Sequence, residues 1–450
     1  ENPEERVVYA SGKKGPQPSM SSEKWLKDCS QMLGDFVRHL EHSKLAPHIV
    51  GYLPAGGNTS EWFWWGYNEG MVDYSVINSN AFRCYLRSLY ESDAALAKAW
   101  NDPAVTLNSA RIPVVEFRNR SEDGFFRLPA VSRQVYDYRK FMSKVTVEAI
   151  RHTVQVVRHN LATRKLVGTF YGYSVYLSGN HFQRLDNLGF QGLAELLADR
   201  EIDFLCAPTV YDRRRATGEG DYILGYTASL KLHNKIYYDE ADMRTHLYRG
   251  GEDYRTGTEA ETLSVNWRTF GNALTQGVNI WWFLLADNAS FHSKAIMEQI
   301  AKISRLDREL LNVTKKSCAE VAYFCDEESM YYVNSDQRRL RDFVRMAQAE
   351  AARTGAPGDF YLLSDIGNEK LPDYKLYIFL NAFFITPEQR DIIHRKLARN
   401  KATALWFYAP GYISPQGSSP ETMKALTGFT FRKHSSLAAE SFEMVSSSHP

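Results

Sequence analysis

From residue 21 to about residue 310 the chain alternates amphipathic helical segments with short apolar runs, and this alternation constrains the fold most. In the first helical segment, residues 21 to about 43, apolar residues recur mostly at steps of three and four and so share one face. Short apolar runs between such helices are typical of βα units around a parallel sheet. We therefore predict an α/β fold.

Five apolar runs are predicted to be strands of this sheet, at residues 48–53, 165–171, 202–207, 235–239 and 278–285. Helices are predicted near residues 81–90, 132–161, 190–199, 222–232, 259–276 and 293–311. Parallel strands this apolar need cover on both faces, which a (β/α)8 TIM barrel provides. A barrel closes with eight strands, and residues 6–10 are one further candidate. We expect the chain to lack the first barrel strands and the upstream sequence to supply them.

The pattern restarts at about residue 316, with strands predicted at 318–325, 330–333, 360–363, 376–380 and 404–408 and helices near 337–353 and 387–399. We therefore predict three domains: residues 1–314 as the C-terminal part of a barrel, 315–415 as a smaller α/β domain, and 416–450 as a linker or the start of a further domain. No strand in the second domain leads into a glycine-rich phosphate loop or a nucleophile elbow. We expect no second active site.

The composition excludes several classes of protein. Fifty-four basic and 53 acidic residues leave a net charge of +1, so no overall field attracts nucleic acid or an anionic membrane. No apolar run reaches the roughly 18 residues that a membrane-spanning helix needs. The five cysteines are scattered, without metal-ligand spacing. We expect a soluble protein with a neutral substrate and no metal or organic cofactor.

Glu61 follows the first predicted strand after a Pro/Gly-rich turn, and four aromatic residues, Trp62 to Trp65, come directly after it. In α/β barrels the carboxyl ends of the strands and their loops build the active site, so this carboxylate is placed at a pocket. Desolvation by the aromatic residues raises the pKa of a carboxyl group, as a general acid requires. The alternative is a surface glutamate in a turn, with aromatic residues packed on the barrel rim.

Glu240 ends the predicted strand at residues 235–239 and follows Asp239. Neighbouring strand residues point to opposite sides, so only one of the two carboxylates faces the pocket, and Glu240 at the end is the better candidate. Pairing with Arg244 would keep it ionised, as a nucleophile needs. The alternative is an ordinary acidic strand end with basic neighbours.

The two carboxylates are more informative as a pair. Two predicted strands separate the strand before Glu61 from the strand before Glu240, which is the relation of barrel strands four and seven. Such strand ends face each other across one pocket, and a retaining glycosidase holds its two carboxyl groups about 5–5.5 Å apart.

Residues 49–65 and 235–247 resemble the family 42 glycoside hydrolases, the β-galactosidases of clan A. Residues 371–382 and 404–411 resemble the amidotransferase-like domain through which that family forms trimers, and the resemblance covers about residues 20 to 430. It implies retaining hydrolysis of terminal β-galactosides, with Glu61 as acid/base and Glu240 as nucleophile. It also implies a carbohydrate substrate, a homotrimer and about three more N-terminal strands. The compartment stays open, and a bacterial protein of the cytoplasm or periplasm is favoured.

Clan A enzymes generally carry Asn immediately before the acid/base, where this chain has Ser60, and Asn58 is the candidate to replace that Asn. Further candidates for substrate binding lie at the other strand ends: Tyr173, Tyr211, Arg213, Trp282 and Asp287. Two other functions stay open. One is a carbohydrate-binding scaffold without catalysis, which Ser60 favours. The other is a different clan A activity, on mannosides, fucosides or agar fragments.

Overall fold

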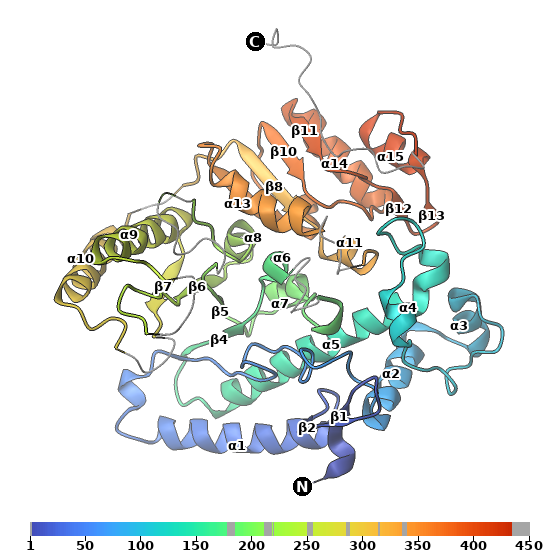
Figure 1. The fold of residues 1–450 in the computed structure, drawn as a ribbon, viewed down its shortest axis with the longest axis horizontal. Helices are drawn as coiled ribbons and strands as arrows, with labels where there is room; N and C mark the ends of the chain where they lie inside the picture. Colours follow the sequence, from blue (N-terminus) through green and yellow to red (C-terminus); the bar gives the residue numbers. More distant parts are fainter. Residues whose placement is uncertain are drawn as a thin grey trace.

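The computed structural model describes residues 2–177, 185–210, 218, 220–249, 255–284, 289–313, 316–334 and 340–433. Five parallel strands form a curved sheet in the order β3, β4, β5, β6 and β7 (Figure 1). Their bounds are Gly51–Tyr52 for β3, Leu166–Phe170 for β4, Phe204–Pro208 for β5, Ile236–Ala241 for β6 and Asn279–Trp282 for β7. All five predicted strands are confirmed, and each pairs with its neighbour in chain order.

Helices connect and cover these strands. They are α1 (Glu23–Glu41), α5 (Pro129–Asn160), α6 (Ser174–Leu177), α7 (Leu193–Ala198), α8 (Thr227–Leu232), α9 (Glu259–Gln276) and α10 (Lys294–Leu310). The excursion after β3 holds α2 (Val76–Leu89), α3 (Asp93–Trp100) and α4 (Val115–Asn119). Local sequence fixes several starts, since the Ser22 hydroxyl accepts from the Trp25 amide and Thr258 forms a capping box with Glu261. Among the helices described, none has the length and apolarity to cross a membrane.

The sheet is an open part of a barrel. Residues 6–10, the candidate for an earlier barrel strand, are a wrong prediction: β1 (Arg6–Val8) pairs antiparallel with β2 (Lys14–Pro18) in a separate sheet. Among the described strands, β3 and β7 form the two edges. Large apolar side chains are exposed on the segments that precede β3 and follow β7 in the chain: Met32, Phe36, Leu45 and Val50 before β3, and Leu284, Met297, Leu311 and Val313 after β7.

A second parallel sheet follows, in the order β11 (Thr403–Trp406), β10 (Leu376–Phe379), β8 (Val321–Cys325) and β9 (Gly358–Leu362). Its other elements are α11 (Glu327–Tyr331), a π-helical turn at Arg341–Met346, α13 (Ala347–Ala351), α14 (Pro387–Asn400), β12 (Ile413–Ser414), β13 (Gly417–Ser418) and α15 (Pro420–Thr427). The predicted strand at 330–333 is wrong. Asp326 caps the Ser329 amide and starts α11 there, which overrides the strand preference of the β-branched and aromatic residues that follow.

The two sheets share an interface in which α8 packs against β9. Ala228 of α8 belongs to the apolar cluster of the second sheet, and the Ser229 hydroxyl accepts from the Leu362 amide at 2.8 Å. His233 Nε2 lies 2.7 Å from Asp365 Oδ1 at the end of the same interface. Figure 1 shows the second sheet above the first, with α8 and α11 between them.

Candidate active site

A strained turn after β3 carries Glu61. The Trp62 amide donates to the Gly56 carbonyl at 2.7 Å, and the Asn58 amide donates to the Phe63 carbonyl at 2.8 Å, which closes the turn. Within it Thr59, Ser60 and Trp62 have φ values of 56°, 66° and 66°, a region that residues with a side chain seldom adopt. Backbone strain of this kind gathers at functional sites, where surrounding packing maintains it.

The packing that holds the turn comes from the aromatic residues after Glu61. Trp62, Phe63 and Trp64 are each 1% exposed, so they belong to the core and not to an open pocket wall. The Trp62 indole donates to Thr169 Oγ1 on β4 at 2.6 Å. This contact fixes the turn to the neighbouring strand.

The Glu61 carboxylate has two hydroxyl donors. Tyr173 donates to Oε1 at 2.5 Å and Thr59 donates to Oε2 at 2.6 Å. Burial raises the pKa of the Glu61 carboxyl, and these two hydrogen bonds offset part of the rise. Tyr173, a predicted binding residue, is thus brought to Glu61, and its ring packs against Phe63 and Phe190. A raised pKa suits a carboxyl group that delivers a proton near neutral pH.

Glu240 lies near the end of β6, where side chains alternate between two environments. Tyr237, Asp239 and Ala241 are buried on one face, while Tyr238 and Glu240 are partly exposed on the other. The expectation that Asp239 and Glu240 point to opposite sides is therefore confirmed. Arg244 lies with its guanidinium over the Tyr248 ring, 5.2 Å from the centroid, and its pairing with Glu240 stays a prediction.

The Cys206 thiol on β5 is influenced by both glutamates. Burial, then the charge of Glu240, then the charge of Glu61, raises the pKa of its thiol well above the usual value. Inside a protein the charge of a carboxylate acts over a longer range than in water, because the surroundings screen it less. Two carboxylates separated by 179 positions in the sequence therefore both raise the pKa of one buried thiol on the central strand of the curved sheet.

Aromatic residues line the same face of the sheet. Trp281 is paired in register with Glu240, and its ring lies 5.7 Å from Tyr238 and 6.1 Å from Phe170. Trp282, the predicted binding residue, is paired with Ala241 on the opposite face and packs on the apolar cluster there. The register favours Trp281 over Trp282 as the aromatic residue beside Glu240.

The other predicted residues have different positions. Asn58 is partly buried at the base of the turn, and Ser60 is exposed at its tip. Tyr211, Arg213 and Asp287 lie outside the described residues. Thr59 and Cys206 were missed, because nothing in their local sequence singled them out.

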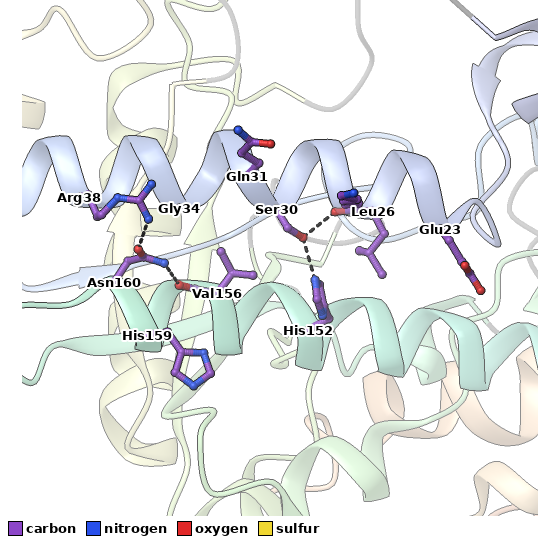
Figure 2. A pocket seen from close by; sticks show the side chains of 11 residues that line it. Glu23, Leu26, Ser30, Gln31, Gly34, Arg38, His152, Val156, His159 and Asn160 are labelled. Carbon is purple, nitrogen blue, oxygen red and sulfur yellow. Dashed lines mark hydrogen bonds between the residues drawn. The ribbon is translucent and has the colours of Figure 1, made fainter.

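A groove between α1 and α5 is a separate feature (Figure 2). Ser30 contacts His152 at 2.8 Å across it, and Arg38 donates to Asn160 at 2.5 Å. None of the predicted site residues lines this groove, and its polar side chains bond the two helices to each other. In the part of the chain described here, no group of three or more His, Cys, Asp or Glu is arranged to hold a metal ion.

The fold defines the class of protein: a TIM-barrel-like (β/α) fold, of which the described chain supplies five strands in one parallel sheet. No family model matches the sequence, and no curated protein matches it. Solved structures do. The chain is similar to a β-galactosidase from the psychrophilic Marinomonas ef1, at 13% identity and a TM-score of 0.63, over 94% of this chain and 66% of that one.

Two further structures share the fold. A GH42 β-galactosidase from G. stearothermophilus is 14% identical, with a TM-score of 0.58 over 92% of this chain and 59% of that one. An exo-carrageenase GH42 from Bacteroides ovatus is 11% identical, with a TM-score of 0.62 over 92% and 56%. The chain therefore has a GH42-like fold and spans less than two thirds of the length of these structures.

Proposed function

We propose that this chain is part of a retaining glycoside hydrolase that cleaves terminal β-galactosides or similar β-glycosides. The observation that carries the proposal is the placement of Glu61 after β3 and of Glu240 near the end of β6, with two strands of the same parallel sheet between them. Two carboxylates at the ends of strands separated by two others, beside aromatic residues, suit the protonation and attack that glycosidic bonds need.

In the proposed reaction Glu240 attacks the anomeric carbon while Glu61 donates its proton to the leaving oxygen, so that the glycosidic bond breaks and a glycosyl ester forms on Glu240. Glu61, now ionised, then removes a proton from water. The hydroxide attacks the anomeric carbon, frees the sugar with its original configuration and regenerates both carboxyl groups. The Tyr173 and Thr59 hydroxyls stabilise the ionised form of Glu61 during the second step.

A galactoside is the preferred substrate because structures with this fold include several β-galactosidases. The exo-carrageenase with the same fold makes other β-glycosides a reasonable second choice. Of the predicted contacts, Asn58 and Tyr173, with Trp281 in place of Trp282, are proposed to bind the sugar; Tyr211, Arg213 and Asp287 remain proposals from sequence.

The proposal is tested by hydrolysis of a panel of aryl β-glycosides and by labelling. A 2-deoxy-2-fluoro galactoside with a good leaving group is expected to esterify Glu240, because the fluorine slows both steps while the good leaving group speeds only the formation of the covalent intermediate, which therefore accumulates. Peptide mass spectrometry locates the label. A label on any other carboxylate contradicts the assignment of the nucleophile.

A carbohydrate-binding scaffold without catalysis is the second candidate. Ser60 favours it, because it stands where clan A enzymes generally have Asn and its side chain is exposed at the tip of the turn. Binding of galactose measured by calorimetry, without turnover of any aryl glycoside in the panel, would support this function and contradict the first.

We further propose that the second sheet, within a domain of residues 315–415, mediates a homotrimer. Leu405 and Tyr408 are exposed apolar side chains of this domain, as an interface with another copy requires. Sedimentation of the protein is expected to give the mass of a trimer, and a monomer at micromolar concentration contradicts this assembly.

We also propose that three additional βα units pack against the exposed apolar residues that flank β3 and β7 in the chain, and that they close the barrel.

A further inference from the structure

A carboxylate that follows a strand of the second sheet forms hydrogen bonds with two helices of the first sheet, α6 and α7. Glu327 stands at the start of α11, directly after β8, and is 9% exposed. Its Oε2 accepts the Leu193 amide at 3.1 Å, and its Oε1 accepts the Ser174 hydroxyl at 3.4 Å. Since α7 begins at Leu193 and has no side-chain cap of its own, Glu327 satisfies one of its free amides from the other sheet.

A second contact from the same strand end holds Ser174. The Ser174 hydroxyl lies 3.2 Å from the Tyr226 hydroxyl, which donates to Cys325 Sγ at 3.3 Å. Ser174, Tyr226 and Cys325 are each at most 1% exposed. The residues at the end of β8 therefore hold Ser174 in two ways, directly through Glu327 and through Tyr226, which contacts Cys325.

Ser174 is adjacent in the chain to Tyr173, whose hydroxyl donates to Glu61. A shift of the Ser174 backbone must move Tyr173, because the two share a peptide unit. The contacts run from Glu327 through Ser174 and Tyr173 to Glu61, each of them a direct hydrogen bond or a single peptide link.

We propose that Glu327 is a positioning residue for the candidate active site: it fixes Ser174 and the start of α7, and thereby holds the Tyr173 hydroxyl on Glu61. The second sheet then has a part in catalysis besides assembly. This inference rests on the proposed function for its kinetic consequence, while its geometric part stands on the hydrogen bonds alone.

The test compares Glu327→Ala with Glu327→Gln. Burial raises the pKa of the Glu327 carboxyl to about 7, so a neutral glutamine is a close replacement: its carbonyl oxygen accepts the Leu193 amide and its NH2 group donates to the Ser174 oxygen. Asp365→Asn is the matched control, since Asp365 is also buried and also bonds across the interface, to His233, without contacting Ser174.

Glu327→Ala is expected to lower kcat about 10- to 100-fold on alkyl β-galactosides, which need a proton at the leaving oxygen, with little change in KM. The loss of kcat should be smaller on dinitrophenyl galactosides. The kcat of Glu327→Gln should stay within about threefold of that of the parent protein, as is usual for a conservative change. Asp365→Asn should lower the unfolding temperature, and any loss of kcat in this variant should be the same on both substrates. Equal losses on both substrates, or the same pattern in Asp365→Asn, overturn the proposal.

Crystal structures of the variants separate this inference from the proposed function. The hydrogen bond from Tyr173 to Glu61 is expected to be lost in Glu327→Ala and kept in Glu327→Gln and Asp365→Asn. If the parent protein hydrolyses no glycoside, the proposed function fails while the positioning role is still decided by these structures. An unchanged bond in folded Glu327→Ala refutes the positioning role.

Discussion

Glu240→Gln is expected to lower kcat for aryl β-galactosides by at least about 10⁴-fold, the order of loss seen when the nucleophile of a covalent mechanism is removed. Glutamine has nearly the same shape as glutamate, but its amide is too weak a nucleophile to attack the anomeric carbon. Because Glu240 is partly exposed near a strand end, we expect the variant to fold and to unfold at a temperature close to that of the parent protein. Steady-state kinetics and thermal unfolding check both statements.

Chemical rescue makes this prediction sharper. Glu240→Ala leaves space for a small anion, so azide is expected to restore turnover of dinitrophenyl galactoside and to give the α-galactosyl azide. Formation of the β-azide would show that a carboxylate other than Glu240 is the nucleophile. Retention of a tenth of the parent activity by Glu240→Gln would likewise exclude the proposed role.

Glu61→Ala should produce a loss that depends on the leaving group. On alkyl galactosides, whose leaving oxygen needs a proton, we expect kcat/KM to fall by about 10²- to 10⁴-fold, the usual contribution of general acid catalysis. On dinitrophenyl galactosides the first step needs no acid, and the loss should be far smaller. Equal losses on the two substrates would show that Glu61 is not the acid.

The pH profile gives an independent measurement on the same residue. Burial raises the pKa of Glu61, so the protonated acid persists to higher pH than for an ordinary glutamate, and activity should fall as pH rises through that raised value. Tyr173→Phe is the matched control: loss of its hydrogen bond, which favours the charged form, should move this basic limb to still higher pH. The limb should be absent in Glu61→Ala.

Much of the fold was predictable because it depends on local periodicity. The five strands of the first sheet and the helices between them follow from apolar spacing, and the caps at Ser22 and Thr258 mark helix starts. The prediction failed where spacing was not decisive. Residues 330–333 have the composition of a strand, yet the Asp326 cap makes helix α11 begin just before them.

The solvent exposure of individual side chains could also not be predicted from the sequence. The apolar face predicted for the first helix is real as a pattern, but Met32 and Phe36 are 68% and 56% exposed while Val37 is fully buried. Periodicity shows that residues share a face, and only the packed neighbours determine whether that face is covered.

The sequence by itself determined that Glu61 follows one predicted strand and Glu240 ends another, with two predicted strands between them along the chain, because apolar runs and the alternation of side chains are local properties. Only the tertiary structure decided which groups surround them. Tyr173, Cys206, Trp281 and Glu327 come from segments distant in sequence, and the curvature of the sheet and the packing of the second sheet bring them together. Hydrogen bonds form only between groups about 3 Å apart, so the positions of the two carboxylates along the chain could be read from the sequence, whereas the groups that surround them could not.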